Sequence, residues 1–111
     1  MEISYNDFAK IDIRVGTVSR VEPYPEARKP AYKLWVDFGS EVGKKKSSVQ
    51  ITEHYTVESL IGRQVAAVVN FPPKQIGKFM SECLVLGFPD ADGRVVLIGT
   101  DQKIPDGGKL F

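Results

Sequence analysis

The amino-acid sequence predicts an all-β fold with short helices, namely a five-stranded OB-fold barrel with short additions at both ends. Three observations predict this class. Short segments that alternate between apolar and polar residues recur along the chain, a glycine interrupts the first, and one helical segment separates the third from the fourth. The 111 residues, of which 42% are hydrophobic and 26% charged, allow one domain, residues 1–111, around one core.

The first elements are a short helix and a bent strand. Ser4 and Asp7 have the spacing of a capping box, which predicts a helix over residues 5–10. Residues 11–21 then alternate as a strand does, until Gly16 shifts the alternation by one position. Because one extra residue in a strand restores the alternation and bends the strand, we expect a β-bulge at this glycine.

The second and third strands alternate most regularly. A stiff loop with three prolines leads to residues 31–39. In that strand Tyr32, Leu34, Val36 and Phe38 are expected to face the core, while Lys33, Trp35 and Asp37 face outward. In residues 46–52 the inward positions are Ser47, Val49 and Ile51, and Ser48 and Gln50 point outward, beside Trp35.

The remaining elements complete the barrel. Residues 52–63 read as a short helical segment that Gly62 ends. Strands are expected over residues 65–70 and 83–86, and residues 95–98 pair back across the turn at 89–94. A β-sandwich would require more strands than this chain supplies, so the order of elements favours the OB-fold.

No catalytic constellation is present in the sequence. The single histidine, His54, lies in the helical segment, where a helix-surface or capping role is expected. The single cysteine, Cys83, lies in an apolar strand and is expected to act as a small buried hydrophobe. The glycines form no phosphate-binding pattern, and no pair of soft ligands exists for a metal. We therefore expect neither an enzyme, nor a cofactor, nor a metal site.

Localisation is predicted from what the chain lacks. The N-terminus has no secretory signal pattern, and no apolar run approaches the about 18–20 residues of a membrane span. One cysteine cannot form an internal disulfide, which fits a reducing compartment. The expected location is cytoplasmic, without membrane insertion.

Positive charge is concentrated in one part of the chain, although the net charge is only +1. Between positions 28 and 46 there are six basic residues and two acidic ones, a local charge of +4. The basic residues are Arg28, Lys29, Lys33, Lys44, Lys45 and Lys46. Such a run is compatible with an anionic partner. An ordinary solvated surface is the alternative.

Trp35 is the most informative aromatic residue, because it lies on the outward side of an alternating strand. An outward tryptophan can stack on a nucleic-acid base, line a pocket for apolar peptide groups, or anchor an oligomer contact. It can also cover a small satellite core. OB-folds commonly bind ligands on the outer face of their second and third strands, where Trp35, Ser48 and Gln50 are expected.

The segment "VVNFPPKQIGKFMS", residues 68–81, indicates one rim of a binding site. Asn70 offers a donor and an acceptor, Phe71 an apolar face, and two prolines hold the following loop extended. Lys74 and Lys78 add positive charge. The alternative is a stiff loop that ends a strand and shields its edge.

At these residues the chain resembles a known family. The motifs "KIDIRVG", "EARKPAYKLWVDFG", "SSVQIT", "VVNFPPKQIG" and "SECLVLG" are similar to those of the CsaA proteins, over residues 8–110. CsaA proteins belong to the tRNA-binding-domain superfamily, which includes the C-terminal domain of many methionyl-tRNA synthetases. The resemblance implies an OB-fold, a homodimer formed through the terminal additions and the barrel surface, and a non-catalytic, export-related chaperone for unfolded or precursor polypeptides. The wider superfamily implies tRNA as a second partner.

The resemblance places a ligand site at residues 47–50, residues 70–74 and Ser81, with Arg28 and Lys29 in a basic loop beside it. The predicted peptide- or RNA-binding residues are Trp35, Ser47, Ser48, Gln50, Asn70, Phe71, Lys74, Phe79 and Ser81. The predicted basic patch is Arg28, Lys29, Lys33, Lys44, Lys45, Lys46 and Lys78.

Three positions depart from the pattern of the tRNA-binding relatives. Gln50 stands where those relatives have a glycine, Lys78 replaces a glycine beside Gly77, and Leu84 replaces a methionine. These departures favour the chaperone branch. Two other hypotheses stay open: a tRNA-binding accessory module, and a dimer whose interface uses Trp35.

Overall fold

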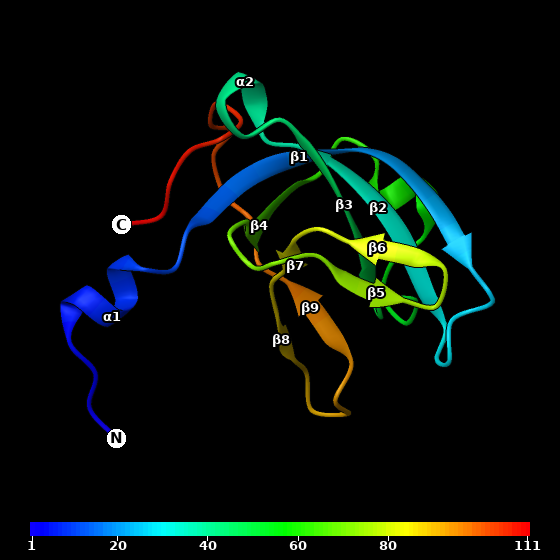
Figure 1. Cartoon of the computed structure of the whole chain (residues 1–111). Coiled ribbons are helices and arrows are strands. Elements are labelled where there is room, and N and C mark those ends of the chain that lie inside the picture. Colours follow the sequence, from blue (N-terminus) through cyan, green and yellow to red (C-terminus); the bar gives the residue numbers. More distant parts are fainter.

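The computed structural model describes all 111 residues, and it is built on one curled antiparallel sheet of five strands (Figure 1). The order across the sheet is β3-β2-β1-β4-β7. The strands are β1 (Ile13–Tyr24), β2 (Ala31–Asp37), β3 (Lys44–Val49), β4 (Gln64–Val68) and β7 (Leu84–Val85). The sheet curls into a half-barrel, so the predicted OB-like, mostly-β fold is confirmed.

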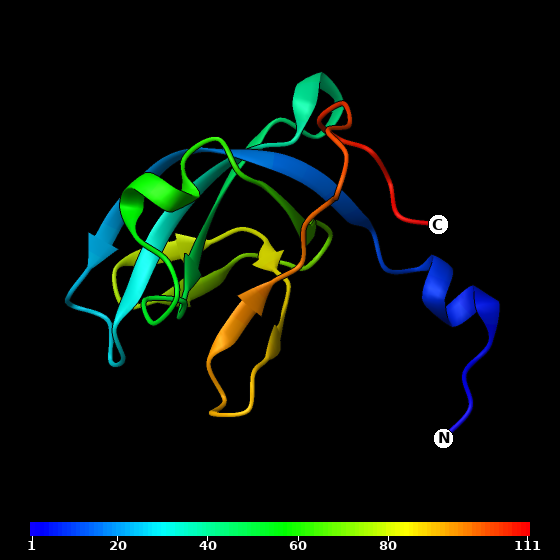
Figure 2. The same cartoon turned by 180° about the vertical axis from the view of Figure 1, so that it is seen from behind.

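Two hairpins and three short helices are added to this sheet. The hairpins are β5 (Lys74–Ile76) with β6 (Phe79–Ser81), and β8 (Gly87–Pro89) with β9 (Val95–Leu97). The helices are α1 (Tyr5–Ala9), α2 (Gly39–Val42) and α3 (Val57–Leu60). The view from behind shows α3 on the barrel, while α1 lies apart from it (Figure 2). The capping box of Ser4 and Asp7 is present at α1, as predicted.

The barrel core holds the apolar residues that the alternation predicted. Leu34, Val36 and Phe38 are completely buried, and so is Val65 of β4. Leu60 of α3 is buried with them, which shows that this helix closes one end of the core. Gly62 ends the helical segment with a positive φ of 84°, a backbone conformation that glycine adopts readily.

The bulge in β1 lies at Ser19, so the prediction of a bulge at Gly16 is wrong. The register shifts between Val18 and Arg20, where β1 pairs with β2. At Gly16, by contrast, β1 pairs regularly with β4. Gly16 instead permits close packing, because a Cβ atom there would lie 2.7 Å from Cδ1 of Phe38.

The half-barrel closes between β3 and the segment that precedes β7. The Glu82 N–H donates to the Lys46 carbonyl (2.7 Å), and the Lys46 N–H donates to the Glu82 carboxylate (3.1 Å). One step along, the Ser48 N–H donates to Ser81 Oγ (3.2 Å). These contacts replace a regular strand ladder, and they stop at Ser48.

The location of His54 corrects the sequence interpretation. It lies in a turn before α3 rather than in a helix. Its Nε2 lies 2.7 Å from Oδ2 of Asp90, which precedes the tip of the β8–β9 hairpin. This pair therefore connects the turn to the hairpin and has a structural role.

Candidate functional site

The candidate site is a cleft of about 860 Å³ beside the C-terminal end of β3. One wall is β3 itself and Gln50, which follows it; the second is the segment from Phe71 through β5; the third is the segment from Ser81 to Val85. The structure brings six predicted site residues together here. They are Ser47, Ser48, Gln50, Phe71, Lys74 and Ser81.

The walls of the cleft are largely apolar and open to solvent. Phe71 is 55% exposed and Leu84 is 50% exposed, on opposite walls. Pro72 and Pro73 extend the apolar surface next to Phe71. Large apolar side chains at this exposure, gathered in one concave surface, are typical of a binding site.

A short hydroxyl network fixes the floor of the cleft. Ser47 is 2% exposed, and its Oγ donates to the Cys83 carbonyl (2.9 Å). Ser81 Oγ, which accepts from the Ser48 N–H, lies 3.3 Å from Ser47 Oγ and 3.4 Å from the Cys83 carbonyl oxygen. These serines therefore close the barrel and position the walls.

Cys83 is a buried structural thiol, as predicted. Burial is the main cause that raises the pKa of Cys83 to about 11, and the nearby positive charge of Lys45 opposes this rise. A thiol with such a pKa is almost entirely protonated at neutral pH, so it is a poor nucleophile.

Asn70 is predicted as a site residue, but its side chain is committed to the fold. Its Oδ1 accepts from the Asp12 N–H (3.0 Å), and its Nδ2 donates to the Lys10 carbonyl (2.8 Å). Asn70 therefore holds the entry into β1 against the end of β4, and it does not line the cleft.

Trp35 and Phe79 lie outside the cleft, in a satellite core on the outer face of the sheet. Their rings meet edge to face with centroids 5.9 Å apart, and Phe79 is only 8% exposed. The β5–β6 hairpin covers this face, held by the Tyr24 hydroxyl that donates to the Ile76 carbonyl (2.6 Å). The binding roles of Trp35 and Phe79 stay predictions, but neither ring is free.

The residue of β3 opposite Trp35 is not one of the expected neighbours, Ser48 and Gln50. Trp35 pairs with Lys46, whereas Ser48 pairs with Lys33. Ser48 is therefore the diagonal and not the direct neighbour of Trp35 on the outer face, and Trp35 does not line the cleft that Ser48 and Gln50 line.

Basic side chains contact the aromatic rings of the satellite core around Trp35 and Phe79. Lys33 Nζ lies 4.6 Å from the ring centroid of Tyr24, and Lys46 Nζ lies 5.1 Å from that of Phe79. The Arg20 guanidinium lies 4.6 Å from the ring of Trp35. Such cation–π contacts hold the charges on the outer face of the sheet.

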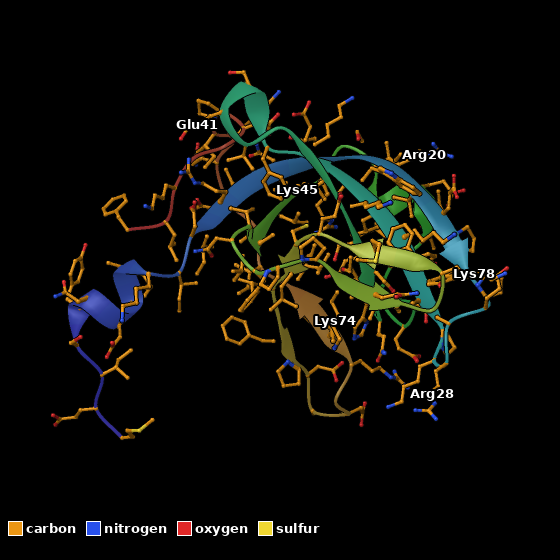
Figure 3. The ribbon with its side chains drawn as sticks, in the orientation of Figure 1. Arg20, Arg28, Glu41, Lys45, Lys74 and Lys78 are labelled. Atoms are coloured by element: carbon orange, nitrogen blue, oxygen red, sulfur yellow. The ribbon has the colours of Figure 1, made fainter.

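The predicted basic patch is divided between different surfaces. Arg28 and Lys78 lie on one side of the molecule together with Arg20, which was not predicted, and Lys45 lies apart from them (Figure 3). Lys45 pairs with Val36, whose side chain is buried, so Lys45 is on the inner side of the sheet. Lys44 and Lys46 alternate to the other side. Lys29 is exposed in the loop between β1 and β2.

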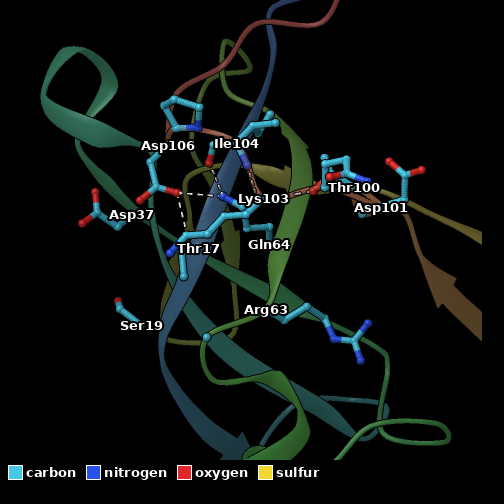
Figure 4. Close-up of a pocket in the computed structure, with 14 residues that line it drawn as sticks. Thr17, Ser19, Asp37, Arg63, Gln64, Thr100, Asp101, Lys103, Ile104 and Asp106 are labelled. Carbon is cyan, nitrogen blue, oxygen red and sulfur yellow. Dashed lines mark hydrogen bonds between the residues drawn. The ribbon is translucent and has the colours of Figure 1, made fainter.

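A second, polar hollow of about 720 Å³ lies between the start of β4 and the C-terminal segment (Figure 4). Gln64 is its central side chain: its Nε2 donates to the Ile104 carbonyl (2.7 Å) and its Oε1 accepts from the Ile104 N–H (3.1 Å). Thr17 donates to Asp106 (2.6 Å). These groups bind the C-terminal segment to the barrel, so the residues of this hollow have a structural role.

The comparisons with known proteins agree with this architecture. Residues 13–109 match the family described as "Putative tRNA binding domain". The chain belongs to the tRNA-binding domain family. A solved structure of the chaperone CsaA from Bacillus anthracis is 48% identical, with a TM-score of 0.94 and complete coverage of both chains. The CsaA chaperone protein from Picrophilus torridus is 53% identical, with a TM-score of 0.92, over 99% of this chain and 100% of that one.

The curated relatives of this tRNA-binding domain are longer proteins. A methionine–tRNA ligase of Porphyromonas gingivalis is 35% identical over 109 residues, which are 98% of this chain and 16% of the ligase. The chain thus spans about a sixth of that relative's length. No helix of the domain has the length and apolar character that crossing a membrane requires.

Sequence reasoning missed the β5–β6 hairpin and its contribution to the cleft. Its signal was present, since Gly77, with a φ of 62°, separates two short alternating segments. A side chain at Gly77 would collide with the Tyr24 hydroxyl, 2.5 Å from the Cβ position. Ile76 and Leu84 also line the cleft and were not predicted as site residues.

Proposed function

We propose that this protein is a non-catalytic, CsaA-like chaperone that binds unfolded or precursor polypeptides in the cytoplasm for export. The observation that carries the proposal is the cleft beside β3, whose walls present the exposed side chains of Phe71 and Leu84. Unfolded chains expose apolar side chains, and an open apolar cleft removes these from water without a chemical reaction.

The full-length similarity to two CsaA chaperones supports this proposal. The similarity to methionine–tRNA ligases is weaker support for any function, because this chain covers only 16% of the first of these enzymes. The domain therefore carries no argument for ligase activity, and a binding role is the function that its own residues favour.

The test compares two pairs of substitutions. Phe71→Ser with Leu84→Ser makes the cleft polar, whereas Phe88→Ser with Val96→Ser changes exposed apolar residues of the β8–β9 hairpin, outside the cleft. Binding of a reduced, carboxymethylated protein, followed by fluorescence anisotropy, should weaken at least about tenfold in the first variant only, since each removed apolar contact contributes about 1 kcal/mol or more. Equal affinities in both variants would refute the proposal.

A second candidate function is tRNA binding, favoured by the family match and by the basic surface around Arg20, Arg28, Lys33, Lys46 and Lys78. Affinity for bulk tRNA should then fall steeply with salt, with a log–log slope of about −0.9 for each duplex phosphate neutralised. Arg28→Glu with Lys78→Glu should weaken binding, and Lys10→Glu with Lys103→Glu is the control of equal charge. A slope near zero would exclude this function.

We also propose that the protein forms a homodimer through its terminal segments. The helix α1 projects from the barrel, and Ile3, Tyr5, Leu110 and Phe111 expose apolar surface near the two ends (Figure 1). Sedimentation equilibrium of the intact chain and of a variant lacking residues 1–10 tests this. A dimer in both samples would contradict an interface at α1.

A further inference from the structure

We propose that an extended polypeptide segment binds in the cleft as an added antiparallel strand, hydrogen-bonded to the open edge of β3 at Ser48 and Gln50. This inference rests on the proposed function and specifies how the cleft recognises its ligand. It assigns the affinity partly to the main chain of the ligand, which every polypeptide shares.

The hydrogen-bonding pattern of β3 shows that this edge is open. In an antiparallel strand the N–H and C=O groups of every second residue point to the same edge. At Lys46 both groups point away from β2 and bond to Glu82, and two residues later the Ser48 N–H bonds to Ser81. The Ser48 C=O and the Gln50 N–H therefore point to this same edge, into the cleft, and neither has a partner within the chain.

The spacing of these two groups fits a strand. An acceptor at Ser48 and a donor at Gln50 flank Val49, which is the arrangement of a widely spaced pair of bonds in an antiparallel ladder. Within the cleft an incoming strand would satisfy both groups. Open strand edges recruit extended chains in this way in many peptide-binding domains.

The opposite wall offers a second set of main-chain groups. Leu86 donates its N–H to the Ala66 carbonyl of β4, so the groups of Val85 point away from β4. The Cys83 carbonyl, two residues earlier, points toward β3 and accepts from Ser47. The main chain of Val85, which lines the cleft, thus faces the space between β7 and β3.

The chemistry of the lining favours a polypeptide over RNA at this position. The charged residues that line the cleft are one lysine, Lys74, and one glutamate, Glu82. A balanced charge does not attract a phosphate backbone, whose binding depends on neutralisation by Lys and Arg. Phe71, Ile76 and Leu84 provide apolar surface for alternate side chains of a strand.

The first experiment uses the unchanged protein and a synthetic peptide of alternating valine and threonine, acetylated and amidated at its ends. Two versions carry N-methyl groups, one on the valines and one on the threonines, because N–H groups of alternate residues point to opposite edges of a strand. We expect at least one version to bind at least about tenfold more weakly than the parent peptide, and both to do so where the bound strand also pairs with Val85. Binding of both versions within about threefold of the parent peptide would overturn the added strand while leaving peptide binding established.

The second experiment uses two variants at one position. Gln50→Pro removes the N–H that points into the cleft and leaves the ladder with β2 intact, and Gln50→Ala removes the side chain but keeps the N–H. The proline variant should lose about tenfold in affinity for the parent peptide, and the alanine variant should resemble the unchanged protein. If the proline variant fails to fold, the N-methyl comparison decides alone.

Two further outcomes separate this inference from the proposed function. If neither the parent peptide nor a carboxymethylated protein binds, then the proposed function and the added strand fail together. Hydrogen exchange of the Gln50 amide should slow when the parent peptide is added. If bulk tRNA slows this exchange and the peptide does not, the edge belongs to an RNA site, and the inference is overturned.

Discussion

The closure of the barrel at the cleft depends on two hydroxyl groups that share one acceptor. Ser47 Oγ donates to the buried Cys83 carbonyl at 2.9 Å, and Ser81 Oγ lies 3.4 Å from the same oxygen. In Ser47→Ala the Ser81 hydroxyl can turn to this carbonyl and replace the lost donor. In the double variant Ser47→Ala with Ser81→Ala the carbonyl has no donor.

The expected loss of unfolding free energy follows from two costs. Leaving a buried acceptor unpaired costs about 1–3 kcal/mol, whereas losing one net hydrogen bond costs about 0.5–1.5 kcal/mol. Each single substitution should therefore lower the free energy of unfolding by about 1 kcal/mol. The double variant should lose about 3 kcal/mol, which is about 1 kcal/mol more than the sum. This excess is the measurable sign of the shared carbonyl.

Urea unfolding followed by Trp35 fluorescence provides the assay, because Trp35 is the only tryptophan and packs against Phe79. Ser81→Ala combined with Ser59→Ala is the control, since Ser59 caps α3 and shares no hydrogen-bond partner with Ser81. That control pair should be additive. Additivity within about 0.3 kcal/mol for Ser47 and Ser81 as well would refute the shared acceptor.

Three further predictions concern packing and ionisation. Gly16→Ala should destabilise the fold by about 1–3 kcal/mol in urea unfolding, because its Cβ would collide with the buried ring of Phe38; an unchanged midpoint would contradict this. The pKa of Cys83, raised mainly by burial from 9.0 to about 11, predicts that stability falls as the pH rises from about 9 to 11, and that Cys83→Ala removes this dependence. The hydrogen bond from His54 is the main cause that lowers the pKa of Asp90, so its stabilising effect is present above the ordinary range of an aspartate and is lost as the pH falls through the lowered value. His54→Ala should raise the pKa of Asp90 in an NMR titration, but not fully, since backbone N–H groups still donate to this carboxylate.

The regular parts of the fold could be predicted from the sequence. Alternation is a local signal, and in β2 it placed Leu34 and Val36 in the core and Trp35 on the outer face. The capping box of α1 is equally local. The position of the bulge could not be predicted in the same way. A shift in the apolar–polar alternation of β1 shows that the strand contains an extra residue, but it does not show which residue this is. The bulge lies at Ser19, where β1 pairs with β2.

The candidate site was predicted only in part, for a physical reason. Phe71 and Lys74, which were predicted from the proline-rich segment after a strand, do line the cleft. The roles of Trp35 and Phe79 depend on a covering hairpin, and contacts between distant segments leave no periodic signal. Asn70 had suitable chemistry for a ligand site, but its donor and acceptor are both used by main-chain groups of residues 10–12.

The β5–β6 hairpin contributes residues to two surfaces, the cleft and the satellite core on the outer face of the sheet. Lys74 and Ile76 of β5 form a wall of the cleft, while Phe79 of β6 lies under the ammonium groups of Lys33 and Lys46. An occupant that displaces β5 must therefore move the ring beneath these two charges. Any such coupling is reciprocal, so an anion held on the outer face would change the affinity of the cleft by the same factor. The two three-residue strands joined by Gly77 and Lys78 would thus link the affinities of the two surfaces.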